Sequence, residues 1–167
     1  MPPGLRKAVL VAHVASSVGW LGAVAAFLAL AVVGYAVADE QTMRATYITM
    51  EIIGWTALVP LSALTLLTGV LQGLGTRWGV IRHYWVLMKL LITVVATAIL
   101  LLYMQTLSVL ADAAAQPGSA EAAAILPSFS PILHSAAALV ILLVALVLSI
   151  YKPRGATGFG ISNQSES

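Results

Sequence analysis

Four long apolar runs constrain the fold of this chain more than any other feature of its sequence. They cover about residues 8–38, 45–74, 84–110 and 131–151. An α-helix rises about 1.5 Å per residue, so about twenty apolar residues cross the hydrocarbon core of a bilayer, which is about 30 Å thick. Backbone groups in lipid must find their hydrogen bonds within the protein, which favours helices. We therefore predict an all-α, polytopic membrane protein whose four transmembrane helices form an antiparallel bundle.

The composition agrees with this class and narrows the kinds of site that the chain can carry. It is 60% hydrophobic and 8% charged, well outside the habits of soluble domains. The first run is about twice as long as the core of a secretory signal, about 7 to 15 residues, so we expect it to be retained as a helix. Because the chain has no cysteine, disulfides, thiolate metal sites and thioether-linked haem are excluded.

The basic residues next to the apolar runs predict how the bundle is oriented. One side is flanked by Arg6, Lys7, Arg77, Arg82, Lys152 and Arg154, and the other by Arg44 alone. Cytoplasmic segments carry the excess of Lys and Arg, so both termini are expected to be cytoplasmic. We thus expect a multi-pass protein of the bacterial cell (plasma) membrane, with a net charge of +2 that reflects topology rather than nucleic-acid binding.

The chain is expected to form a single four-helix transmembrane domain over residues 1–155. The polar, glycine-containing segment 156–167 is then a disordered cytoplasmic tail. The long connection 111–130 is expected to carry a short surface helix near 119–126.

The second run holds a proline and a polar stripe. Pro60 lies near its middle and predicts a kink, because proline lacks the N–H of a regular helix turn. Thr65, Thr68 and Gln72 follow on one face. Such a stripe suits either hydrogen bonds between helices or the lining of a pocket.

His13 is an ionisable residue about five positions into the first run, where polar groups are costly. Trp20 and Phe27 follow at seven-residue steps, so we expect this stripe to face the bundle interior. Imidazole is a common axial ligand of haem iron, and a dry, aromatic-lined interior suits the macrocycle. The alternative is a neutral imidazole hydrogen-bonded to a serine or to a backbone carbonyl of a neighbouring helix.

Two further candidates begin the third run. Lys89 comes four residues after Trp85. It either snorkels to the membrane surface or turns inward at the depth of His13, where an ammonium group suits a haem propionate. His83 lies at the membrane boundary and is either an ordinary interfacial histidine or a second ligand.

A second group of candidates lies in the opposite leaflet. His134 on the fourth run and Glu51 on the second share a depth and are expected to be partners. Met43, Met50 and Met104 lie at a similar depth, which makes a cluster of the kind that soft copper ions favour. The alternative is that these methionines are ordinary packing residues. His13 and His134 are too far apart in depth to share one haem.

Several motifs resemble those of the CopD-like membrane proteins, which include copper-resistance membrane proteins and the bacterial membrane protoporphyrinogen oxidase that binds haem b. The likeness covers about residues 8–155. It rests on His13 six residues before Trp20 and Gly22, Met50-Glu51 before Pro60, Thr68-Gly69, and Trp85 with Lys89. The stretches GTRWGVIRHYWVLMKLLITVVATAILL and LVLSIYKPRG are similar to a branch of four-helix bacterial proteins, commonly actinobacterial.

The resemblance implies that His13 is a haem ligand and that Lys89 matches the family's intramembrane lysine. The chain departs from the oxidase in one respect. The oxidase has an arginine shortly after its Trp-x-Gly, whereas AVAAFLALAVVGY follows here. That departure argues against the chemistry of the oxidase. Cofactor binding remains the expectation.

The leading hypothesis is a membrane protein that binds haem b and carries out redox or electron-transfer work, as a haem-dependent oxidoreductase or an electron carrier. Its partner would be quinol, porphyrin or a redox protein, and a homodimer would allow sites to pair across a two-fold axis. The candidate cofactor-binding residues are His13, Trp20, His83, Lys89 and His134, with His13 and His134 as the metal ligands. The alternatives are copper binding or transport through the Met/His/Glu cluster, and a cofactor-free structural subunit.

Overall fold

The computed structural model describes residues 1–75 and 84–151, and these residues form helices and connections without a strand. Four of the described helical segments are long and apolar enough to cross a membrane. They are Pro3–Ala36, Glu40–Gly75, Tyr84–Ala114 and Ser130–Tyr151. The prediction of an all-helical chain with four such segments is therefore confirmed. The predicted tail, 156–167, lies outside the described residues.

Helix α1 (Pro3–Ala36) begins with proline in its first turn, where the missing N–H costs nothing. It starts five residues earlier than the apolar run, because Arg6 and Lys7 are good helix formers and extend it. Its buried residues recur at steps of three and four and so lie on one face. They are Ser16, Trp20, Val24, Phe27, Ala31 and Gly34. The predicted Trp20 and Phe27 stripe thus faces the interior.

The second segment is one helix with an irregular turn at its centre. Helix α2 (Glu40–Ile53) continues into the π-helical turn η1 (Gly54–Leu58) and then into α3 (Val59–Gly75). Pro60 cannot donate a backbone hydrogen bond to the preceding turn, and the wider π turn just before it accommodates that missing bond. The irregularity before Pro60 is thus a π-helical turn with an extra residue, and the kink itself stays a prediction.

Gly54 brings this turn close to the next long helix. A Cβ added at Gly54 would lie 2.6 Å from Cε of Met104, so a larger residue there would require the end of the methionine side chain to shift. Met104 belongs to α4 (Tyr84–Ala114). The close approach makes η1 part of the packed core.

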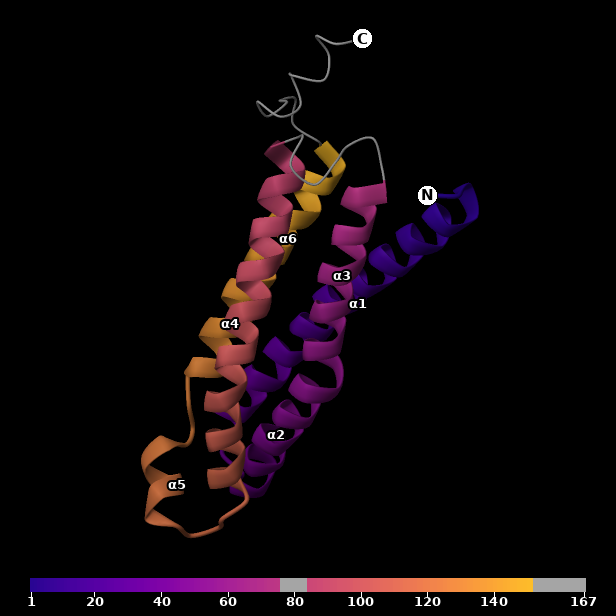
Figure 1. Cartoon of the computed structure of the whole chain (residues 1–167). Helices are drawn as coiled ribbons and strands as arrows, with labels where there is room; N and C mark the ends of the chain where they lie inside the picture. The colour runs from indigo at the N-terminus through magenta and orange to yellow at the C-terminus, as the bar shows by residue number, and fades with distance from the viewer. Residues whose placement is uncertain (76–83, 152–167) are drawn as a thin grey trace.

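Two helices complete the fold. The short α5 (Ala120–Ile125) confirms the helix expected in the long connection, and the Ser119 hydroxyl caps it by accepting the N–H of Ala122 at 3.0 Å. Helix α6 (Ser130–Tyr151) follows, with Pro131 in its first turn. Figure 1 shows α5 at the end of the molecule opposite to the start of α1 and the last turn of α6.

The core is concentrated at the α5 end of the molecule. Tyr47, Met50, Met104 and Leu107, from α2 and α4, are completely buried. Within the described residues, α1 has no buried residue before Ser16, and α4 has none before its residue 103. We call the opposite end, formed by the start of α1, the end of α3, the start of α4 and the end of α6, the open end.

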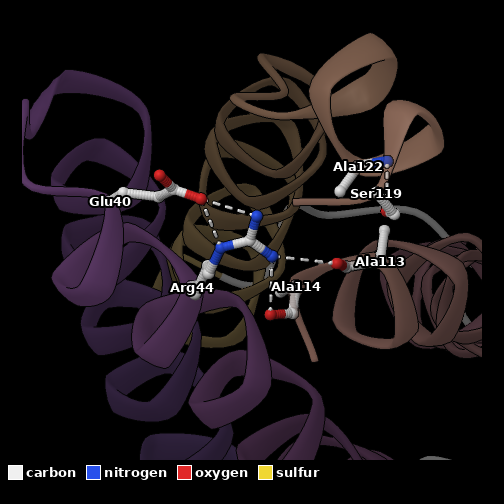
Figure 2. A network of polar contacts seen from close by, with 6 residues as sticks. All are labelled: Glu40, Arg44, Ala113, Ala114, Ser119 and Ala122. Carbon is white, nitrogen blue, oxygen red and sulfur yellow. Dashed lines mark hydrogen bonds and ion pairs between the residues drawn. The ribbon is translucent and has the colours of Figure 1, made fainter. Parts of the chain in front are cut away.

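Arg44 joins two helices at the α5 end. Arg44 of α2 donates to the carbonyl oxygens of Ala113 and Ala114 at 3.2 and 3.0 Å, where α4 ends (Figure 2). The Ala113 carbonyl also accepts the N–H of Gln116 at 3.2 Å. The guanidinium of Arg44 also forms a salt bridge with Glu40 at 2.7 Å. Arg44, expected only as a flanking base, therefore ties α2 to the end of α4.

Candidate functional site: a cavity at the open end

A cavity of about 970 Å³ lies at the open end between α1, α3, α4 and α6. It exists because the apolar faces of these helices close around the α5 end and leave the open end without buried α4 residues. Its walls are mostly apolar, with a smaller number of polar and charged side chains. The latter include Arg6, His13, Ser17, Thr65, Gln72, Lys89, Thr93 and Ser149.

His13 of α1 is held against α3. Its Nδ1 lies 3.0 Å from the Oγ1 of Thr68. Gly69 provides the space, because a Cβ at that position would lie 3.2 Å from Cε1 of the imidazole. The hydroxyls of Ser16 and Ser17 donate to the His13 carbonyl at 3.1 and 2.7 Å and so turn back onto their own helix.

The Thr68 hydroxyl determines which nitrogen of His13 carries the proton. Its single hydrogen has acceptors on its own helix, the carbonyls of Leu64 at 2.6 Å and Thr65 at 3.2 Å. The Thr68 oxygen is then the acceptor of the Nδ1–H of His13, and the lone pair of the neutral ring lies on Nε2. We assign this tautomer from the hydrogen-bond network.

This bond is compatible with both sequence-based interpretations of His13, and the haem-ligand role stays a prediction. It is an interhelical hydrogen bond to a hydroxyl, as a purely structural histidine requires, although the hydroxyl belongs to threonine rather than serine. It is also the arrangement of metal-binding histidines, which commonly donate one ring N–H to a protein oxygen and present the other nitrogen.

Thr65 also lies at the cavity. It is 6% exposed and is among the lining residues. Among the described residues its Oγ1 is buried without a hydrogen-bond partner. Buried hydroxyls in proteins nearly always have one, so Thr65 is an exception within the cavity wall.

Two more candidates from the sequence reach the same cavity. Trp20, 3% exposed, and Lys89 both line it, together with Trp85 one turn before the lysine. Lys89 is thus among the lining residues, and both an inward and a snorkelling ammonium group stay predictions. The third candidate on this side, His83, lies outside the described residues.

His134 lies elsewhere. It does not line the cavity, and its ring stacks on Tyr103 with centroids 4.1 Å apart and planes 19° apart. Its Nδ1 lies 2.9 Å from the carbonyl of Ser130 on its own helix. The expected separation of His13 from His134 agrees with this placement.

The expected partnership of Glu51 with His134 is not seen in the described part of the chain. Glu51 Oε1 instead accepts a hydrogen bond from Ser108 Oγ at 2.5 Å. Met50 and Met104 are completely buried in the core. No group of three or more His, Cys, Asp or Glu side chains gathers in the described residues. Copper binding by the methionines stays a prediction.

Sequence reasoning placed Thr68 on a polar stripe but did not identify it as the partner of His13. The spacing of Thr65, Thr68 and Gln72 was the available signal. Gln72 also contacts α1, since its Nε2 donates to the Val9 carbonyl at 3.3 Å. The pairing required knowing that α1 packs against α3.

Comparison with protein-family models, with curated proteins and with solved structures gives no match for this chain.

Proposed function

We propose that this chain is a bacterial plasma-membrane protein that binds haem b in the cavity at the open end and takes part in redox or electron transfer. The four helices would run antiparallel, with both termini cytoplasmic. The excess of basic residues near the open end, including Arg6 and Lys7, supports that orientation.

The tautomer of His13 carries the proposal. With Nδ1–H given to Thr68, the ring presents Nε2 as the electron-pair donor that a haem iron needs. A volume of about 970 Å³ is at the upper end of the range of about 300 to 1,000 Å³ for small-molecule sites. The mostly apolar walls suit a large, flat and mostly apolar group.

The other residues of the cavity have distinct roles in this proposal. Trp20 and Trp85 provide apolar wall against which a macrocycle packs and exclude water. Arg6 and Lys89 provide positive charge for the two propionates. Bound haem would supply a one-electron couple that exchanges electrons with quinol, porphyrin or a redox protein.

The proposal names His13 as the ligand of the iron, because it is the one histidine among the described residues that lines the cavity. His134 stacks on Tyr103 away from it.

The test is an absorption spectrum of the full chain made in haem-replete cells, or supplied with hemin after purification. We expect a Soret band that shifts when dithionite is added. His13→Ala should lose or strongly change that band while the far-ultraviolet circular dichroism stays helical.

His134→Ala is the matched control, because that histidine lies outside the cavity. It should keep the wild-type spectrum. Protein that stays colourless after hemin is supplied contradicts the proposal, and so does an unchanged band in His13→Ala.

A further inference from the structure

The wall of the cavity is incomplete between α1 and α6. Trp20 and Leu142 line the cavity and are only 3% and 9% exposed, so the two helices close around that level. One turn nearer the open end, residues that also line the cavity are much more exposed. They are Val14 at 51%, Val18 at 60% and Leu146 at 41%. The cavity is therefore open on this side.

The opening lies at the depth of the hydrocarbon core. Val14 and Val18 are 11 and 15 residues after Pro3, or about 16 to 22 Å along a helix that is 34 residues long. Leu146 is 16 residues into α6, a helix of 22 residues that just matches the membrane thickness. Side chains at this opening face lipid rather than water.

The two basic side chains of the cavity and Gln72 lie near the helix ends. Arg6 is in the first turns of α1, Gln72 in the last turn of α3 and Lys89 in the second turn of α4. The cavity thus has a basic, polar part near the membrane surface and an apolar opening deeper in the bilayer. An occupant that matches both parts has an apolar body and at least one anionic group.

We infer that the cavity takes an anionic amphiphile directly from the bilayer, through the opening between α1 and α6. This inference rests on the proposed function where the occupant is haem, which has an apolar macrocycle and two carboxylates. A phospholipid with an anionic headgroup shares this chemistry and would use the same route. In both cases the apolar body passes Val18 and Leu146, and the anionic group is held by Arg6 and Lys89.

The first test measures how fast hemin passes from phosphatidylcholine vesicles to the reconstituted full chain. In Val18→Trp and in Leu146→Trp, the larger side chain should slow the growth of the Soret band by about tenfold or more, because access is gated at the opening. Each rate is taken from a growth curve scaled to that variant's own final Soret absorbance.

Val32→Trp is the matched control. It adds the same side chain to an exposed position of the same helix, 47% exposed, that does not line the cavity. It should load at the wild-type rate. Wild-type loading rates in both opening variants would overturn the inference.

The second test does not depend on haem. Because the chain has no cysteine, a nitroxide can be attached at a single site, Leu90→Cys on the cavity wall. Its collisions with oxygen, which dissolves in the bilayer, should exceed those with a water-soluble nickel complex, and Val18→Trp should reduce the oxygen collisions.

The two proposals can fail separately. If hemin gives no Soret band and the nitroxide still favours oxygen, haem binding fails and the membrane opening stands. Anionic phosphatidylglycerol should then be retained by the purified wild type and lost in Arg6→Gln together with Lys89→Gln. A nitroxide that collides mainly with the nickel complex shows a cavity open to water and overturns the lateral route.

Discussion

Thr68 of α3 holds the imidazole of His13 of α1 through a hydrogen bond of 3.0 Å from Nδ1 to Oγ1. The bond joins residues 55 positions apart in sequence. It orients the ring, fixes its tautomer and links the two helices on either side of the cavity.

Replacing Thr68 by valine removes the oxygen while keeping the shape of the side chain. We expect hemin affinity to fall by about 10- to 100-fold, the usual cost of losing the partner of a metal-binding histidine. Thr68→Ser keeps a hydroxyl and should restore most of the affinity. Titration with hemin in detergent measures both, and equal affinities for the valine and serine variants would contradict this role.

Gly69→Val should displace His13. A Cβ alone at Gly69 would already lie 3.2 Å from the ring, and the two methyl groups of valine need still more space. We expect a shifted or weakened Soret band with unchanged helix content. Gly22→Val is the control, because nothing lies within 4 Å of a Cβ there. A normal band in Gly69→Val would show that the ring does not need its present position.

Arg44→Gln should destabilise the α5 end, since it removes a charged donor from two carbonyls of α4. The side chain of Arg44 is only 13% exposed, and hydrogen bonds to charged groups contribute about 1.5 to 3 kcal/mol. Thermal unfolding in detergent, followed by circular dichroism, should show a lower midpoint.

Glu40→Gln separates the two interactions of Arg44. The side chain of Glu40 is 66% exposed, and surface ion pairs contribute only about 0 to 1 kcal/mol. Its unfolding midpoint should therefore stay near that of the wild type. A larger loss in Glu40→Gln than in Arg44→Gln would place the stabilisation in the salt bridge instead.

Protonation of the Asp39 carboxylate at low pH should destabilise the start of α2. The hydroxyl and the N–H of Thr42 donate to its carboxylate at 2.6 and 2.8 Å, and these bonds lower the pKa of Asp39 below its usual value. A lowered pKa means that the cap stabilises the helix above the ordinary carboxyl pKa of about 4 and is lost as the pH falls through the lower, folded value.

Hydrogen exchange of the first amides of α2 at decreasing pH measures this effect. Protection, corrected for the intrinsic rate, should fall in the wild type below that ordinary pKa. In Asp39→Asn it should vary little with pH, because the amide has no carboxyl proton to gain. The same acid dependence in both proteins would assign it to another group.

The sequence predicted the helices well because their apolar runs are long and a lipid-exposed backbone has few alternatives. Their ends were less certain. Helix α4 continues to Ala114, four residues past the apolar run, because Arg44 caps its carbonyls. That contact joins residues 69 and 70 positions apart, and no local pattern reveals such a pairing.

The candidate site was partly predictable for the same reason. The stripe of His13 and Trp20 follows from helix periodicity, and its inward face was expected. Thr68 and Gly69 act on His13 through the packing of α1 against α3. Their roles depend on the relative rotation of two helices, which composition and spacing do not determine.

Because the core lies at the α5 end, the residues that stabilise the fold are mostly different from those that determine which ligand binds. The completely buried side chains that stabilise the bundle lie around Tyr47 and Met104, whereas most residues of the cavity wall lie outside the core, with Trp20 and Leu142 belonging to both. Exchanging wall residues such as Val14 or Leu146 should therefore change what the molecule holds without deciding whether it folds. The same fold could therefore bind different ligands, in evolution or by design, while the core at the α5 end stays unchanged.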